Sequence, residues 1–181
     1  MDIKVHAAKI KLIVFDVDGV LTNGQISIGR DGEIMKQFYA QDGLGISAAH
    51  KAGLKTAIIT GRDSEMVKFR GAELKIGDIY QGAMNKLEAI DELIAKHKLE
   101  LDEIAYVGDD LNDLPVIMQV GFACAPSNAV PEVKERVHYT AACQGGNGAV
   151  REIVELILKA QGKWDSIIEA YSKPGTIDTR Q

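Results

Sequence analysis

The sequence contains few of the features that mark secreted, membrane-spanning or metal-clustered proteins. Only two of its 181 residues are cysteines, and Cys124 and Cys143 have neither metal-ligand spacing nor the density of a disulfide framework. No apolar run approaches the length of a membrane span, and the first residues lack the basic-then-apolar pattern of a signal peptide. These absences lead us to expect a cytoplasmic protein with reduced cysteines that does not bind membranes.

Basic residues are fewer than acidic residues in this sequence. The chain has 21 lysines and arginines against 26 aspartates and glutamates, a formal net charge of -5, and no run of basic residues. We therefore expect no nucleic-acid partner, and an anionic substrate would need positive charge gathered locally at its site. The histidines form no pair with metal-ligand spacing and give no sign of a zinc site; they are His6, His50, His97 and His138.

What the sequence does contain is an ordinary globular composition, 46% hydrophobic, in which apolar runs of strand length alternate with helical patterns. The length suits one domain, and the alternation predicts an α/β fold with a doubly wound parallel sheet. Strands are expected at Lys11–Asp16, Lys55–Ile59, Asp78–Tyr80, Ile104–Gly108, Phe122–Ala125 and, at one edge, His138–Tyr139. Helices are expected at Leu44–Ala52, Ser64–Leu74, Asn85–Lys98, Asn112–Val120 and Gly148–Gln161.

An insertion follows the first expected strand. Residues 25–34 carry apolar side chains at every second position around a Gly-Arg-Asp-Gly turn, which predicts a β-hairpin within about residues 23–40. No later gap is long enough for a cap domain, so we expect a single core, residues 1–161, and a C-terminal tail, residues 162–181. The apolar face of an uncovered hairpin favours association, and we expect an oligomer.

Two carboxylates, Asp16 and Asp18, follow directly on the apolar run Leu12–Phe15. The C-terminal end of a buried parallel strand is where open α/β sheets bind their ligands. Close carboxylates repel each other and lose hydration when buried, which favours a bound cation, and Mg²⁺ fits a site of few carboxylates. The alternative is a plain turn, because Asp and Gly are common turn residues.

Further polar groups follow the later apolar runs. Thr60-Gly61-Arg62 follows the second strand, Lys86 comes next, and an acidic cluster beginning at Asp109 follows a fourth strand. In a parallel sheet these strand ends lie at one edge. The order Asp-x-Asp, hydroxyl, lysine and acidic cluster resembles that of the haloacid dehalogenase superfamily of phosphohydrolases over nearly the whole chain, which implies a Rossmann-like core.

The resemblance implies a two-step hydrolysis. Asp16 would attack phosphorus and form an aspartyl-phosphate. Asp18 would protonate the departing oxygen and then activate water, so it must carry a proton when the leaving group departs. Mg²⁺ would be held by the side chains of Asp16 and Asp109 and by the main-chain carbonyl of Asp18.

The remaining motif residues would support this chemistry. Thr60 and the amide of Gly61 would hydrogen-bond phosphate oxygens, and Lys86 would neutralise the charge that spreads over them. Asp110 and Asp113 would lie behind the metal ligands and orient waters and Lys86. Either aspartate could instead cap a helix.

More of the sequence resembles one family of this superfamily, the capless phosphatases that act on 3-deoxy-D-manno-octulosonate (Kdo) 8-phosphate and so make Kdo for bacterial lipopolysaccharide. The resemblance implies a Mg²⁺-dependent homotetramer and a sugar-phosphate substrate. Its motifs are Asp16–Thr22, Asp42-Gly43-x-Gly45, Thr60-Gly61-Arg62, Tyr80-Gln81-Gly82, Gly108-Asp109-Asp110 and Gly145–Glu152. The implied substrate contacts are Asp18, Tyr39, Ala40, Gln41, Asp42, Gly43, Ser47, Thr60, Gly61, Arg62, Arg70 and Lys86.

Several alternatives stay open on sequence alone. The family often has Arg where this chain has Ser47, and Arg62 and Arg70 could simply lie on an exposed helix face. Relatives act on nine-carbon sialic-acid-type 9-phosphates. Outside enzymes, a phospho-acceptor or scaffold module has similar parts, although a receiver domain has them in another order. Relatives also imply that Thr176–Gln181 order over a neighbouring subunit's active site.

Overall fold

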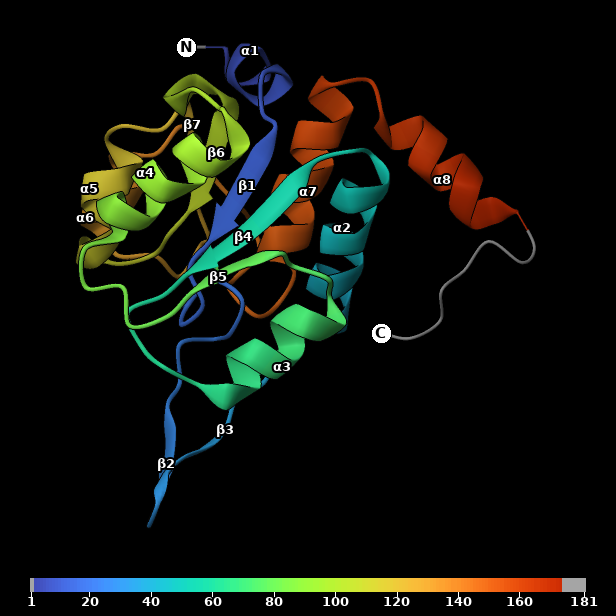
Figure 1. The fold of residues 1–181 in the computed structure, drawn as a ribbon. Helices are drawn as coiled ribbons and strands as arrows, with labels where there is room; N and C mark the ends of the chain where they lie inside the picture. The colour runs from blue at the N-terminus through green and yellow to red at the C-terminus, as the bar shows by residue number, and fades with distance from the viewer. Residues whose placement is uncertain (1, 174–181) are drawn as a thin grey trace.

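The computed structural model of this protein describes residues 2–173. Its centre is a six-stranded sheet in the order β5-β4-β1-β6-β7-β8, with every neighbouring pair parallel (Figure 1). β1 pairs with β4 on one side and with β6 on the other, so the order in which strands are added to the sheet reverses between β1 and β6. Sheets of this kind bind ligands at that point. The strands are β1 (Leu12–Phe15), β4 (Lys55–Ile59), β5 (Asp78–Tyr80), β6 (Ile104–Val107), β7 (Phe122–Ala125) and β8 (Tyr139–Thr140).

Helices cover both faces of the sheet, which confirms the doubly wound α/β prediction (Figure 1). Alternate residues of β1 point to opposite layers: Ile13 and Phe15 join one core cluster, and Leu12 and Val14 join the other. The first cluster lies under α1 (Ile3–Ala8), α2 (Ala40–Lys51), α3 (Glu65–Glu73) and α7 (Ala149–Ala160). The second lies under α4 (Lys86–His97), α5 (Leu114–Ile117) and α6 (Pro131–Lys134).

The expected hairpin is formed by β2 (Ser27–Gly29) and β3 (Gly32–Met35), which pair with each other and not with the main sheet. It projects from the core as an arm (Figure 1). Its turn residue Gly32 has φ +116°, a conformation that side chains with a Cβ rarely adopt. Within residues 2–173 no further domain covers the sheet edge, in agreement with a capless core.

Two helix predictions need correction. Helix α2 begins at Ala40, four residues before the expected start, so Asp42 and Gly43 lie in the first turn of a helix. The expected helix over residues 112–120 is a 3₁₀ turn, Leu111–Asp113, followed by the short α5. The helices α1 and α6 were not expected, and the edge strand β8 lies one residue later than predicted.

The early start of α2 has a tertiary cause. The buried carboxylate of Asp42 accepts hydrogen bonds from the main-chain N–H groups of Gly148 and Arg151, at 3.3 and 2.8 Å, at the start of α7. A Cβ at Gly45 would lie 3.1 Å from the Arg151 Cα, so the glycine lets the two helices approach closely. Packing and this cap outweigh the low helix propensity of glycine.

The C-terminal tail begins with a helix. Helix α8 (Trp164–Ser172) packs Ile167 against the core, while Ile168 is exposed. The expectation that Thr176–Gln181 close over a neighbouring site falls outside the described residues. Among residues 2–173, no helix combines the length and the apolar character needed to cross a lipid bilayer.

Candidate active site

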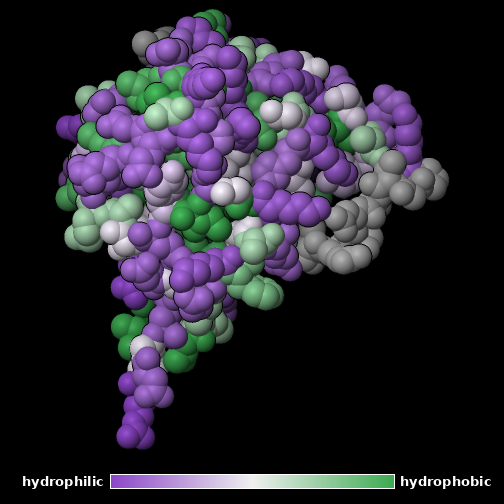
Figure 2. Space-filling view, in the orientation of Figure 1, coloured by the Kyte–Doolittle hydropathy of each residue, from purple (hydrophilic) through white to green (hydrophobic). Residues whose placement is uncertain are grey.

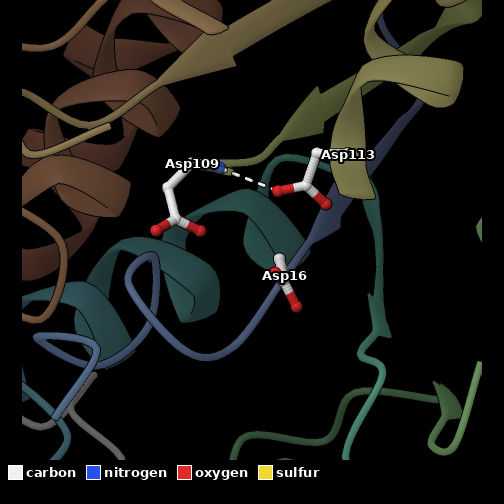
Figure 3. A group of neighbouring side chains, drawn as sticks. All are labelled: Asp16, Asp109 and Asp113. Atoms are coloured by element: carbon white, nitrogen blue, oxygen red, sulfur yellow. Dashed lines mark hydrogen bonds between the residues drawn. The ribbon is translucent and has the colours of Figure 1, made fainter. Parts of the chain in front are cut away.

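Three carboxylates meet at the point where the chain changes direction. Asp16 follows β1, and Asp109 and Asp113 follow β6; each offers an oxygen within 4.8 Å of the others (Figure 3). Asp16 and Asp113 are buried. The structure therefore brings Asp16 and Asp109 together, as expected for residues that follow neighbouring parallel strands, and Asp113 lies beside them.

Asp113 has its oxygens fully occupied by protein donors. Oδ1 accepts from the Tyr106 hydroxyl at 2.6 Å and from the Lys86 ammonium at 2.6 Å, while Oδ2 accepts from the main-chain N–H groups of Asp109 and Asp110 at 2.8 and 3.2 Å. A Cβ at Gly108 would lie 2.5 Å from the Asp113 carboxyl carbon, so glycine is required there. Asp110 and Asp113 also cap the 3₁₀ turn, which was the alternative considered for them.

Lys86 bridges the two sides of the site. It is the first residue of α4, whose N-cap Asn85 accepts a hydrogen bond from the Leu87 N–H. The buried Lys86 ammonium lies 3.0 Å from Asp16 Oδ2 in addition to its contact with Asp113. Burial lowers the pKa of Lys86, but the two carboxylates outweigh it and raise the pKa above its usual value. Lys86 therefore holds a fixed positive charge beside Asp16.

The acidic groups opposite Lys86 carry more negative charge than it can neutralise. Burial, followed by the charge of Asp113, raises the pKa of Asp16 to about 6. Burial and the charges of Asp113 and Asp16 raise the pKa of Asp109 to about 7. An ionised pair here is unfavourable without a further cation.

The site fits a hard divalent cation such as Mg²⁺. Asp109 Oδ1 is buried and has no hydrogen-bond partner within residues 2–173, as expected of an atom that coordinates a metal ion. A Cβ at Gly19 would lie 2.0 Å from Asp109 Oδ2, so glycine keeps this space open. The donors are carboxylate oxygens, the ligands that Mg²⁺ prefers. Asp113 is the poorest ligand of the three, because its oxygens already accept four hydrogen bonds.

Asp18 lies in a separate charged network at the base of the hairpin. Its Oδ1 is 2.5 Å from the ammonium of Lys36, and its Oδ2 is 3.8 Å from Arg62 Nε. Lys36 also lies 3.0 Å from Glu33 Oε1. Sequence reasoning missed Lys36 and Glu33, because a lysine and a glutamate in a hairpin normally face solvent.

The other predicted residues are spread over the surrounding elements. Thr60 is buried at the end of β4, and Gly61 has no atom within 4 Å of the position that a Cβ would take. Arg70 lies on α3 beside Gly43 and pairs with Glu73 at 2.5 Å, while its Nε is buried without a hydrogen-bond partner among the described residues. Four predicted positions lie at or next to α2. Tyr39 precedes the helix, Ala40 and Gln41 are exposed in its first turn, and Ser47 is half-buried further along it.

Comparison with known proteins agrees with this geometry. A family model of haloacid dehalogenase-like hydrolases matches residues 68–153. The 3-deoxy-D-manno-octulosonate 8-phosphate phosphatase KdsC of Escherichia coli K12 is 44% identical over 164 residues, which cover 91% of this chain and 87% of the relative. The chain belongs to the haloacid dehalogenase-like hydrolases.

Solved structures of this hydrolase family resemble the whole chain. The 3-deoxy-D-manno-octulosonate 8-phosphate phosphatase of Moraxella catarrhalis, solved with magnesium, phosphate and KDO, is 45% identical with a TM-score of 0.91 and covers 93% of this chain and 97% of its own. The cobalt-bound phosphatase YrbI of Haemophilus influenzae is 36% identical with a TM-score of 0.89, covering 93% and 99%.

The hydrolase has an open groove of about 950 Å³ beside the Asp18 network. Lys36 and Phe38 line it on the hairpin side, and Phe69 and Arg70 line it from α3. Of the predicted substrate contacts, Ala40 and Arg70 lie in this groove. It therefore connects a residue that touches Asp18 with the arginine expected to bind substrate.

Proposed function

We propose that this protein is a Mg²⁺-dependent phosphatase that hydrolyses Kdo 8-phosphate to Kdo and inorganic phosphate in lipopolysaccharide biosynthesis. The observation that carries the proposal is the cluster of Asp16, Lys86 and Asp109 at the strand ends, in a chain 45% identical to a phosphatase whose structure contains magnesium, phosphate and KDO. The relatives at 44–45% identity are named for the eight-carbon substrate, so the nine-carbon alternative is not favoured.

Asp16 is the nucleophile in this proposal. Its carboxylate attacks phosphorus and the sugar oxygen leaves, giving an aspartyl-phosphate that water then hydrolyses. The ammonium of Lys86, 3.0 Å away, keeps positive charge beside the reacting oxygens throughout. Thr60 and the Gly61 amide bind the phosphate oxygens at the end of the adjacent strand β4. Thus each group at the sheet edge either reacts or offsets the charge of phosphate.

Asp18 gives the proton to the departing sugar oxygen and takes one from the attacking water in the second step. An alkoxide is a poor leaving group, so this proton is needed for a sugar phosphate and hardly for an aryl phosphate. The side chain lies at the base of the hairpin, between Lys36 and Arg62, on the groove side of the site. Its ion-pair partners among residues 2–173, Lys36 and Arg62, differ from the Lys86 that pairs with Asp16.

Mg²⁺ would be held by the side chains of Asp16 and Asp109 and by the main-chain carbonyl of Asp18. Asp109 Oδ1, which has no hydrogen-bond partner among residues 2–173, supports this set of ligands. Asp113 already accepts four hydrogen bonds, so we place it with Asp110 behind the ligands, where both orient the groups that bind the ion. When bound, the ion neutralises negative charge on the phosphate and on the carboxylates around it.

The substrate's sugar acid would lie in the groove toward α3. Arg70 carries a buried Nε without a partner among the described residues, and a guanidinium suits a carboxylate. Arg62, with 46% of its side chain exposed, lies near Asp18, with 3.8 Å between its Nε and the Asp18 Oδ2. The segment from Tyr39 to Gly43 and the polar Ser47 would border the sugar through exposed or main-chain atoms, because the Asp42 side chain already caps α7.

Assembly as a homotetramer is part of the proposal. The hairpin arm carries four exposed apolar side chains, Ile26, Ile28, Ile34 and Met35, and Figure 2 shows hydrophobic atoms gathered toward the base of the arm, above a hydrophilic tip. Association through the arm would cover them and shelter the open site. The expectation of a cytoplasmic protein stays a prediction.

The deciding experiment compares purified protein on Kdo 8-phosphate, a nine-carbon 2-keto acid 9-phosphate and p-nitrophenyl phosphate, with Mg²⁺ and with a chelator. We expect Mg²⁺-dependent phosphate release with the highest kcat/KM for Kdo 8-phosphate. A higher kcat/KM for the nine-carbon substrate would replace the substrate assignment. The absence of turnover on every phosphate would favour a phospho-acceptor or scaffold module.

A further inference from the structure

The hairpin brings one lysine into the site, and its burial is unusual. The Lys36 side chain is 1% exposed, although it follows the exposed strand β3. Its ammonium contacts two carboxylates, Asp18 at 2.5 Å and Glu33 at 3.0 Å. A buried ammonium is very unfavourable unless it is paired, so the fold keeps Lys36 inside only because these carboxylates meet it.

Lys36 is itself held in place from the other side. Glu33 Oε2 accepts a hydrogen bond from the Ser64 hydroxyl at 2.6 Å, and Ser64 is the N-cap of α3. Glu33 Oε1 also lies 3.8 Å from Arg62. The base of the hairpin is therefore tied to the core, and Lys36 has a fixed position relative to the loop that follows β1.

We propose that Lys36 is a positioning residue that holds the Asp18 carboxylate in its working orientation. The inference rests on the proposed function, since it takes Asp18 as the proton donor to the leaving oxygen. Lys36 donates a hydrogen bond to Oδ1, which restricts the rotation of the carboxyl group, while Oδ2 lies 3.8 Å from Arg62 Nε and accepts no hydrogen bond from Lys36. Such preorganisation matters because proton transfer requires hydrogen-bond distance to the departing oxygen.

The arrangement argues against Lys36 as a direct substrate ligand. Lys36 lines the groove, yet almost none of its side chain is exposed and its ammonium already has two anionic partners. Lys9 provides a control outside the groove, because it is exposed and pairs with Asp102 at 3.0 Å on the surface. Replacing each lysine therefore separates an effect on Asp18 from a general loss of positive charge.

The test is a double-mutant cycle with Kdo 8-phosphate and p-nitrophenyl phosphate. We expect Lys36→Met to lower kcat on Kdo 8-phosphate about 10- to 100-fold, with KM within about 3-fold, because it impairs a general acid worth about 10²- to 10⁴-fold. The burst of p-nitrophenol, whose release needs no proton, should change little. Adding Lys36→Met to Asp18→Asn should produce no further loss, whereas Lys36→Arg should restore part of the activity and Lys9→Met should match the unmodified protein.

Other outcomes would overturn the inference. Effects of Lys36→Met and Asp18→Asn that multiply, or a rise in KM alone, would make Lys36 an independent substrate ligand. If Lys36→Met misfolds because Glu33 and Asp18 face each other, the variant Glu33→Gln/Lys36→Met removes one charge and serves in the same cycle. An Asp18→Asn variant whose p-nitrophenol burst falls as far as its turnover of Kdo 8-phosphate would refute the role of Asp18 as proton donor. If Asp18→Asn behaves as expected and Lys36→Met has no effect, only the positioning role of Lys36 is refuted.

Discussion

Asn128 donates a hydrogen bond from Nδ2 to the carbonyl oxygen of Gly19 at 2.9 Å. Its Oδ1 accepts a hydrogen bond from the Gly145 N–H at 2.6 Å, and a Cβ at Gly145 would lie 1.8 Å from the same Gly19 oxygen. The glycine-rich segment before α7 thus packs directly on the loop that follows Asp16. The Asn128 side chain therefore holds in place the loop after Asp16, whose main chain is proposed to bind Mg²⁺.

Replacing Asn128 should weaken metal binding. We expect Asn128→Ala to raise the Mg²⁺ Kd about 10-fold, equivalent to about 1.4 kcal/mol, since the Gly19 carbonyl loses its donor and the Gly145 N–H loses its acceptor. Isothermal titration calorimetry measures this directly. Asn23→Ala is the control, because the exposed Asn23 amide hydrogen-bonds Gln25 on the surface. An unchanged Kd for Asn128→Ala would show that the glycine packing alone holds the loop.

Asp16→Asn should reduce kcat on every phosphate substrate by several decades, because it removes both the nucleophile and a metal ligand. Asp18→Asn should keep Mg²⁺ affinity within a few-fold, since its proposed metal contact is a main-chain carbonyl. Phosphate release and calorimetry on both variants provide the comparison. Substantial activity in Asp16→Asn would exclude the covalent mechanism.

The position of Asp16 and Asp109 could be predicted from the sequence, because each follows a short apolar run and parallel strands end at one edge. The burial of Lys36 could not be predicted. It depends on contacts of Glu33 with Ser64, 31 residues away in the chain. Local pattern carries no information on how a hairpin base docks against a distant helix.

The start of α2 is a second feature that the local sequence could not predict. Asp42 and Gly43 have the composition of a turn and a low helix propensity, which predicts a helix that begins only at Leu44. In the folded chain Asp42 caps α7 and Gly43 lies against Arg70. These partners follow much later in the sequence, so only the tertiary structure can show that the glycines serve close packing.

Arg70→Ala should affect the natural substrate selectively. Because p-nitrophenyl phosphate has no carboxylate, we expect KM to rise about 10-fold or more for Kdo 8-phosphate and less than about 3-fold for p-nitrophenyl phosphate. Glu73→Gln, which removes the ion pair of Arg70 at 2.5 Å, tests whether that pair matters for orientation. Equal rises in KM for the two substrates after Arg70→Ala would assign Arg70 to packing against Gly43.

The stability of the metal-free protein should fall as pH rises from about 4 to 7. Raised pKa values of about 6 for Asp16 and about 7 for Asp109, against an ordinary value of 3.8, mean that the folded protein binds more protons than the unfolded chain in this range. Mg²⁺ should therefore raise Tm more at pH 8 than at pH 5, as measured by calorimetry. Asp109→Asn should flatten this pH dependence, and an equal Mg²⁺ effect at both pH values would contradict the assignment of these carboxylates.

The hairpin arm should control assembly. Ile28 and Ile34 expose 71% and 63% of their surface on the arm, and apolar side chains grouped on one exposed segment mark a surface for association. We expect Ile28→Ser/Ile34→Ser to convert the proposed tetramer to smaller species in sedimentation velocity, with Tm of the isolated chain nearly unchanged. Ile168→Ser is the matched control, since Ile168 is 49% exposed on α8, far along the chain from the arm. A mass unaltered by the double substitution would mean that the subunits associate through another face.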